Sequence, residues 1–230
     1  ETLAADAVVV NADAAALAEG LFGPGASHAV RLPEAGERSL SAMTWALSAP
    51  TSGFPLARHN VFFARDYAAE FDAISRRREL PAQPTVYVCA QDRGAPDQAP
   101  GDGAQERLLV LVNAPAIGDR REFTATEMEQ CTNAAFGLLA DCGLAVRRQP
   151  EAIVLTTPVE FESLFPATGG ALYGQAVHGT MAAFRRPGSR SAIPRLYLAG
   201  GSVHPGPGVP MAVLSGRLAA ASLLEDLTSA

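Results

Sequence analysis

The residues best suited to chemistry lie near the C-terminal end, in a stretch that is poor in side chains. An apolar run over residues 195–201 leads directly into GGSVHPGPGVPM, residues 200–211. The spacing of apolar residues over 212–227 predicts a helix, so the segment joins a buried strand to a helix. Because a helix N-terminus presents unpaired N–H groups and partial positive charge, it suits a phosphate or the electron-rich edge of a heterocycle. The alternative is a turn that needs glycine only for a positive φ.

The composition of this crossover favours close approach of a ligand to the backbone. Glycine keeps side chains out of the way, and proline limits the entropy that a loop loses when a ligand docks. The crossover carries glycines at 200, 201, 206 and 208 and prolines at 205, 207 and 210.

A second glycine-rich stretch, residues 169–194, mixes glycines with Tyr173, His178 and Phe184. Glycines among aromatic residues often line a cavity, because the backbone can approach a ligand where no Cβ intrudes. A surface loop would have the same composition, and both interpretations stay open.

Composition limits the class of protein. The chain has 230 residues, 48% of them hydrophobic, a net charge of -6 and a pI near 5.2. These values predict a globular chain with a real core and argue against nucleic acid as a partner. No apolar run approaches the roughly 20 residues that span a bilayer. The chain begins at Glu1 rather than Met, and its first residues lead at once into a hydrophobic segment. For these reasons we expect it to be a fragment of a longer protein.

The cysteines and two of the histidines give no sign of a metal site. Cysteines 89, 131 and 142 form no C-x-x-C pair, so neither zinc nor a disulfide frame is indicated, and a reducing cytoplasm is expected. His28 and His59 have no partners at ligand spacing, and no metal is predicted. Glu160 and Glu162 are expected to be solvated.

The elements that must position these residues alternate between strands and helices. Val8–Val10 lies in an expected strand. Asn11 and Asp13 are expected between the end of this strand and the start of a helix over 14–23. Strands are predicted within 39–49, 59–64, 85–91 and 107–115, and helices over 65–80 and 124–144. Thr124 and Glu127 form a capping-box pattern at the start of the latter.

The last elements frame the crossover. Residues 151–166 read as a strand, a proline break and a short helical turn. In the final helix the apolar stripe is Leu214, Leu218, Ala221 and Leu224, and Gly216 is expected to let that helix lie close to a sheet.

Three quoted stretches carry a family resemblance. The segment LYLAGGSVHPGPGVPMAVLSGRLAA resembles the C-terminal flavin-binding signature of the phytoene-desaturase-like carotenoid oxidoreductases, and TPVEFESLFPATGGALYGQAVHG and ADAVVVNAD resemble two further stretches of that family. The glycine-rich stretches are most similar to the branch of hydroxyneurosporene or methoxyneurosporene desaturases.

The resemblance implies an α/β (α+β) fold: the C-terminal part of an FAD-binding Rossmann-like oxidoreductase, with a mixed or antiparallel-sheet substrate domain flanked by helices. Residues 1–23 and 191–230 would be pieces of the FAD domain, and 24–190 the substrate domain. Residues of the crossover would contact FAD: Gly200, Gly201, Ser202, Val203, His204, Gly206, Gly208, Val209, Pro210 and Met211. For His204, structural support of the turn, flavin contact and proton transfer stay open. Gly170, Tyr173, Gly174 and His178 would contact substrate.

The expected activity is FAD-dependent dehydrogenation of a CH–CH bond in a hydroxylated or methoxylated carotene. The family's N-terminal G-x-G-x-x-G unit is missing from residues 1–230, so the piece alone should be inactive and should bind FAD weakly or not at all. Alternatives are a polyene isomerase, a retinol-type saturase and a non-catalytic binding domain.

A lipophilic carotenoid substrate implies a cytoplasmic protein, peripheral to the inner or photosynthetic membrane. Phe54, Phe62, Phe63 and Phe71 are candidates for apolar contacts there or for core packing. Apolar surface of incomplete flavin-domain pieces also predicts self-association.

Overall fold

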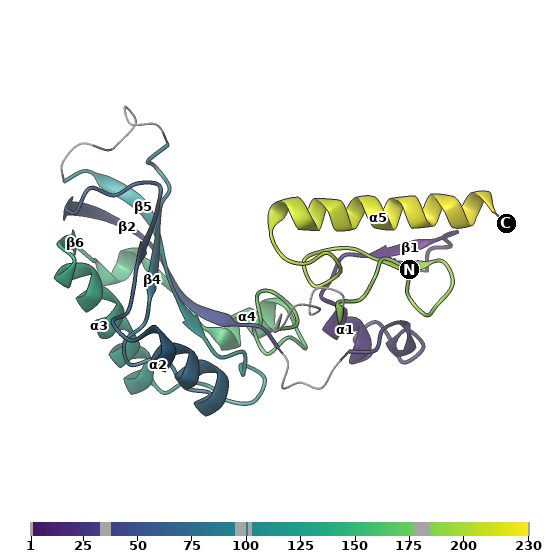
Figure 1. The fold of residues 1–230 in the computed structure, drawn as a ribbon, viewed down its shortest axis with the longest axis horizontal. Helices are drawn as coiled ribbons and strands as arrows, with labels where there is room; N and C mark the ends of the chain where they lie inside the picture. The colour runs from purple at the N-terminus through teal and green to yellow at the C-terminus, as the bar shows by residue number, and fades with distance from the viewer. Residues whose placement is uncertain (1, 33–37, 95–99, 101–102, 177–184, 230) are drawn as a thin grey trace. The chain divides into compact units, whose positions relative to one another are not determined.

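The computed structural model describes residues 2–32, 38–94, 100, 103–176 and 185–229 (Figure 1). The chain divides into two compact units, unit 1 (Glu1–Leu40 and Phe161–Ala230) and unit 2 (Ser41–Glu160). Residues 24–40 and 161–190, which the sequence grouped with the substrate domain, belong to unit 1. The functional roles given to the ranges 1–23, 24–190 and 191–230 stay predictions.

Unit 2 is built on an antiparallel sheet, in which the order is β3-β4-β5-β2-β6 and β7 also pairs with β2. Its strands confirm the runs predicted from the sequence, and the structure adds one short strand, β6, that was not predicted. They are β2 (Ser41–Gly53), β3 (His59–Phe62), β4 (Val86–Ala90), β5 (Gln105–Ala114), β6 (Leu144–Val146) and β7 (Ile153–Thr156).

One face of this sheet forms the core with helix α3 (Ala125–Asp141). Side chains alternate in β4 and β5, so Val88 and Val110 point inward and share a buried cluster with side chains of the helix. Trp45 and Phe136 meet edge to face with ring centroids 5.7 Å apart. The capping box is confirmed, because Glu127 donates its N–H to Thr124 and accepts the N–H of Thr124 in return.

Shorter helical elements complete the chain. Helix α2 (Tyr67–Asp72) continues into a π-helical turn (Ala73–Arg77), and α4 covers Pro158–Leu164. Two 3-10 turns cover Ser27–Ala29 and Pro150–Ala152.

Unit 1 is a small three-layer arrangement. Strand β1 (Val8–Val10) pairs in parallel with β8 (Leu196–Leu198), although each residue is 188 positions from its partner in the chain. Helix α1 (Ala14–Ala18) packs on one face with Leu198, and α5 (Val209–Thr228) packs on the other with Tyr197 (Figure 1). The alternation of β8 side chains therefore sends neighbouring residues to opposite helices. The predicted fold class is confirmed.

Two predictions about helices are wrong. Helix α1 ends at Ala18 rather than at 23, because Gly20 turns the chain with φ of 78°. In α5 the stripe of Leu214, Leu218 and Leu224 is exposed, and the small residues Ser215, Ala219 and Ser222 are buried instead. A Cβ added at Gly216 would meet nothing within 4 Å, so this glycine does not mediate the close approach.

Candidate functional site

The crossover between β8 and α5 is anchored at its start to both neighbouring elements. Gly200 has φ of 122°, and a Cβ there would lie 2.8 Å from Oδ1 of Asn11 at the end of β1. Its N–H donates to the hydroxyl of Ser215 in α5 (3.1 Å). A side chain at position 200 is therefore excluded, and the crossover leaves the sheet where β1 also ends, a place where ligands bind in open parallel sheets.

The next two side chains point inward. Ser202 is buried, and its Oγ accepts the N–H of Ala14 at 3.1 Å. Val203 is buried with Leu17 and Leu198 in the apolar cluster beside α1. These side chains anchor the crossover; a contact of their backbone with a cofactor stays a prediction.

The middle of the crossover is held by backbone contacts. The N–H of His204 donates to the carbonyl of Pro187 (2.8 Å), and the His204–Pro205 peptide bond is cis. Gly206 is buried with φ of 132°, and a Cβ there would lie 3.3 Å from Nε of Arg186. The backbone contact supports the structural interpretation of His204 and leaves its other two roles open.

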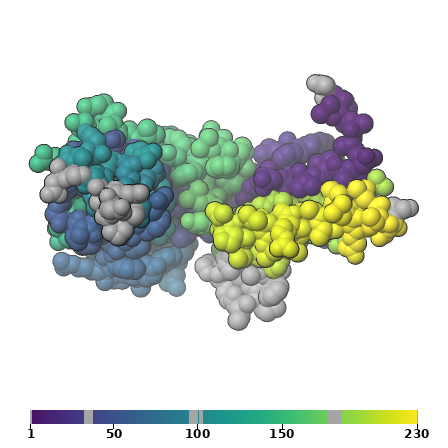
Figure 2. Space-filling view, turned by 90° about the horizontal axis from the view of Figure 1, so that it is seen from above, coloured from purple at the N-terminus to yellow at the C-terminus, as the bar shows by residue number. Residues whose placement is uncertain are grey.

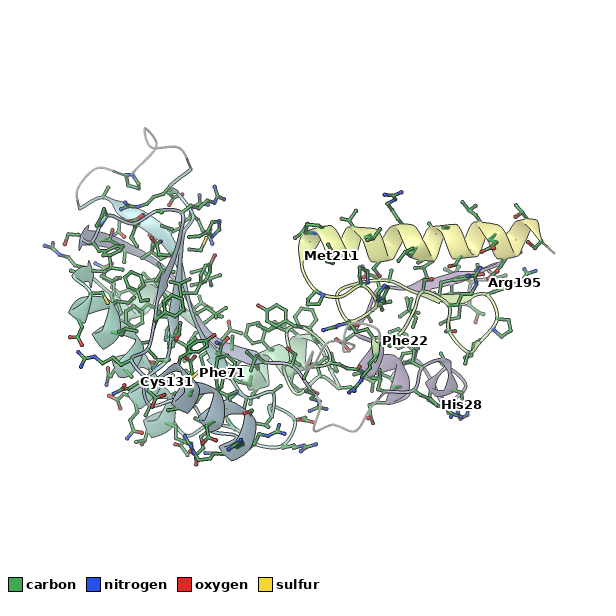
Figure 3. All side chains as sticks on the ribbon, viewed as in Figure 1. Phe22, His28, Phe71, Cys131, Arg195 and Met211 are labelled. Carbon is green, nitrogen blue, oxygen red and sulfur yellow. The ribbon has the colours of Figure 1, made fainter. Side chains whose placement is uncertain are left out.

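The end of the crossover presents the N-terminus of α5 without a side-chain cap. Gly208 is the N-cap residue, with φ of 102°, and the first turn carries no acidic side chain. Val209, Pro210 and Met211 are exposed, and Met211 marks this end of the helix in Figure 3. The N–H groups of Val209 and Met211 and the partial positive charge of the helix end therefore face outward.

Arg186 joins the two glycine-rich stretches, and the sequence analysis missed it. Its side chain is almost fully buried, and its guanidinium donates to the carbonyls of Gly201 (3.1 Å), Tyr173 (2.8 Å) and Gln175 (2.9 Å). Burial lowers the pKa of this guanidinium, with the Asp13 carboxylate opposing. Three acceptors on two segments fix the spacing between those segments.

Glu162 shapes the start of the other glycine-rich stretch. Its carboxylate accepts the N–H groups of Ala167 (2.8 Å), Thr168 (2.9 Å) and Gly169 (2.6 Å). The prediction that this side chain is solvated is wrong, because the loop folds back over it; Glu160 is exposed, as predicted.

A cavity of about 490 Å³ lies within unit 1, against the crossover. Its wall combines small apolar side chains with polar and charged groups. The residues that line it are Asp13, Ala14, Ala15, Ala18, Glu19, Val30, Arg31, Leu32, Arg38, Ala167, Thr168, Ala171, Gly174, Gln175 and Ser202. Of the residues predicted to contact substrate or FAD, Gly174 and Ser202 line the cavity. Ala171 and Gln175 line it as well, which favours the cavity interpretation of residues 169–176 over the surface-loop one.

Asp13 is the acidic group on the inner wall of the cavity. It is the N-cap of α1, as predicted, and Oδ1 accepts the N–H of Ala15 (2.9 Å). Burial raises the pKa of its carboxyl above the usual range, against the opposing effects of the Ala15 hydrogen bond and of Arg186, Arg38 and Ser202. The sequence showed the cap but not the cavity, because the wall comes from segments far apart in the chain.

Gly170 and Tyr173, two other predicted substrate residues, do not line the cavity themselves but adjoin its lining residues Ala171 and Gly174 in the chain. Gly170 is buried, and its N–H donates to the Thr168 hydroxyl (3.0 Å). Tyr173 is exposed, and its carbonyl is held by Arg186. His178 lies outside the described residues.

Residues 1–224 match the family described as flavin containing amine oxidoreductase. The chain belongs to this family. It is 57% identical over 229 residues to a hydroxyneurosporene desaturase of Rubrivivax gelatinosus, covering 100% of this chain and 43% of that protein. A hydroxyneurosporene desaturase of Cereibacter sphaeroides is 45% identical, with 99% of this chain and 45% of that protein covered. A 1-hydroxycarotenoid 3,4-desaturase of a Flavobacterium species is 33% identical, with 80% of this chain and 37% of that protein covered.

These similarities confirm the resemblance to the carotenoid oxidoreductases and to the hydroxyneurosporene desaturase branch. The chain spans less than half the length of these relatives. This is the extent expected of a fragment of such an enzyme.

The geometry of the crossover fits the flavin that this family contains. A Cβ added at the exposed Gly208 would meet nothing within 4 Å, so open space adjoins the backbone there. The uncapped α5 N-terminus offers N–H donors to acceptor atoms such as those at a flavin edge. Nε of Arg186 is a buried donor with no acceptor among the described residues, close to Gly206.

Proposed function

We propose that the chain is the C-terminal part of an FAD-dependent carotenoid desaturase that dehydrogenates a hydroxylated or methoxylated carotene, such as a neurosporene derivative. The observation that carries this proposal is the 57% identity, over the whole chain, with a hydroxyneurosporene desaturase. The open backbone of the crossover supports it, because the family is flavin-containing and needs a surface for that group.

FAD, when bound, would supply the hydride acceptor that the removal of two hydrogens from adjacent carbons requires. The chain's own residues would hold and orient it. Gly208 would expose backbone to it, and the first turn of α5 would stabilise negative charge by about 0.3–1 kcal/mol. Arg186 would keep the crossover at a fixed distance from residues 173–175.

The isolated chain is proposed to be inactive and to bind FAD weakly or not at all. Residues 1–230 contain no G-x-G-x-x-G segment, the unit that receives the pyrophosphate in dinucleotide-binding folds. The crossover alone would leave most of the cofactor without contacts.

The test uses the full-length parent, purified and examined for a flavin absorbance band, then incubated with a hydroxylated carotene. Desaturation extends the conjugated system, so we expect the carotene absorption to move to longer wavelength. An isomerase or a saturase would not lengthen the chromophore, and a non-catalytic binding domain would purify without flavin. A colourless protein that stays colourless after reconstitution with FAD would contradict the proposal.

The lipophilic substrate implies peripheral contact with the cytoplasmic face of the inner or photosynthetic membrane. No helix among the described residues is long and apolar enough to cross a bilayer. Phe62 is a core residue, but the neighbouring rings of Phe63, Tyr67 and Phe71 form a row with centroids 6.2 Å and 4.9 Å apart. Phe63 is 67% and Tyr67 51% exposed, a placement that suits a membrane interface.

The membrane proposal predicts that Phe63→Ser and Tyr67→Ser together lower sedimentation of the full-length protein with vesicles. The residues lie on the surface, so we expect the thermal unfolding temperature to change little. Unchanged sedimentation would show that Phe63 and Tyr67 do not contribute to membrane binding.

A further inference from the structure

The cavity in unit 1 has a charge balance that disfavours an ionic ligand. Asp13 and Glu19 contribute two negative charges to its wall, and Arg31 and Arg38 contribute two positive ones. Glu19 and Arg31 are exposed at the rim, and Asp13 and Arg38 lie deeper. An anion or a cation would meet both signs of charge, so the wall favours a neutral group.

The uncharged part of the cavity wall indicates what the rest of the ligand should be. Ala14, Ala18, Leu32 and Ala171 supply an apolar surface of small and medium side chains. The volume of about 490 Å³ lies within the range of roughly 300–1,000 Å³ typical of small-molecule sites. An aliphatic end group with one polar function matches this combination.

Two polar groups in the wall have hydrogen-bonding capacity left for such a function. The Asp13 carboxylate receives the Ala15 N–H and interacts with the Ser202 hydroxyl, yet a carboxylate has about four acceptor positions. Nε2 of Gln175 is buried with no partner among the described residues. Gln175 is itself a lining residue, and its backbone is fixed by a β-bridge to Arg38 and by Arg186.

The position of the cavity agrees with the chemistry under the proposed function. The relative named 1-hydroxycarotenoid 3,4-desaturase acts, by its name, where the hydroxyl at carbon 1 lies near the new double bond. With bonds of about 1.5 Å, a hydroxyl oxygen on carbon 1 lies within about 5 Å of carbon 4. The group that binds this hydroxyl would therefore lie near the carbons that react, and Ser202 belongs both to the cavity wall and to the crossover that would hold the flavin.

We propose, on the basis of the proposed function, that this cavity receives the hydroxylated end of the carotene. The Asp13 carboxylate accepts the hydrogen of the substrate hydroxyl, and Gln175 Nε2 donates to its oxygen. This pair would select a hydroxylated end group and place the adjacent carbons at the crossover. A carotene without the hydroxyl would leave both protein groups unpaired, which sites of this kind discriminate against strongly.

The experiment compares a 1-hydroxycarotene with the same carotene lacking the hydroxyl, using the full-length holoprotein. Asp13→Asn and Asp13→Ser both keep an N-cap side chain for α1, so the helix start is preserved. Gln175→Leu removes the donor. Asp6→Asn makes the same chemical change at an exposed position of unit 1 and serves as the control. Binding of each carotene and its kcat/KM are both measured, along with flavin content.

We expect Asp13→Ser to weaken binding of the hydroxylated carotene by about 10- to 100-fold, and Asp13→Asn by a smaller factor because an amide oxygen still accepts. Binding of the unhydroxylated carotene should be unchanged, so the ratio between the two substrates collapses. An unchanged ratio in the Asp13 and Gln175 variants, or an equal loss for both carotenes, would overturn the hydroxyl site. A wild-type protein without flavin or without desaturation would overturn the proposed function, and the hydroxyl site with it.

Discussion

At the scale of single residues, Arg186 and Glu106 are buried charged side chains that bind different kinds of partner. Arg186 connects loops in unit 1 through carbonyl acceptors, whereas Glu106 pairs with another side chain in unit 2. Both depend on partners on other segments, so each can be tested by removing one member of the contact.

The Arg186 contact predicts a loss of flavin that exceeds the loss of stability. Arg186→Lys keeps the charge but cannot donate to three carbonyls from one planar group. We expect the unfolding free energy to fall by about 2 kcal/mol or more and FAD dissociation to become faster. The flavin absorbance spectrum should also shift, because the crossover would change its distance from residues 173–175.

Arg185→Gln is the matched control, since Arg185 is the exposed neighbour in the sequence. If the Lys variant loses stability to denaturant but keeps the wild-type flavin spectrum and affinity, Arg186 supports the fold only.

The Glu106 contact predicts a pH dependence of unit 2. Glu106 is fully buried and receives two hydrogen bonds from Arg93, at 2.8 Å and 2.9 Å, as well as the Thr51 hydroxyl. Burial acts to raise the pKa of Glu106, but the hydrogen bonds from Arg93 and Thr51 outweigh it, and the pKa is lowered. A lowered carboxyl pKa stabilises the fold above the unfolded value of about 4.3 and stops doing so as pH falls below it.

We therefore expect Glu106→Gln to cost about 2–4 kcal/mol of unfolding free energy at pH 7, because Arg93 loses its charged partner. The difference from wild type should shrink below about pH 4. Denaturant titrations at several pH values measure it, with the exposed Glu129→Gln as the control. A difference that stays constant down to pH 3 would contradict this account.

At the scale of elements, α5 buries a different face from the one that its apolar stripe predicted. Helix α5, yellow in Figure 2, lies at the surface of unit 1. Its small side chains pack on the two-stranded sheet, and its larger apolar ones are exposed. A helix with a wide apolar stripe normally buries that stripe. The exposed stripe is what a helix shows when the element that would cover it belongs to another part of a longer protein or to a second copy.

This arrangement predicts self-association of the isolated chain. Leu214 and Leu218 are 37% and 39% exposed, so replacing both with Gln should barely change the unfolding temperature. It should lower the binding of a hydrophobic dye and shift the chain toward monomer in sedimentation. Arg217→Gln, an exposed polar site on the same helix, is the control. Dye binding that equals wild type in the Leu variant would show that the apolar surface lies elsewhere.

At the scale of the whole molecule, the short-range patterns were readable from the sequence. The strands of unit 2 other than β6, the capping box at Thr124 and the N-cap at Asp13 depend on neighbours within a few residues, and the structure confirms them. The stretch from Gly200 to Met211 also identified the crossover and, through its resemblance, the family. Local spacing sets these features, because capping and alternation act over one or two turns.

Tertiary structure decided what the sequence left open. The wall of the cavity around Asp13 and the parallel pairing of β1 with β8 join segments from opposite ends of the chain, and the carbonyls that Arg186 binds lie on separate loops. Which face of α5 is buried depended on the close approach of the sheet, which accepts only small side chains such as Ser215 and Ala219. No periodicity in the sequence encodes such contacts, since they depend on which surfaces meet in space.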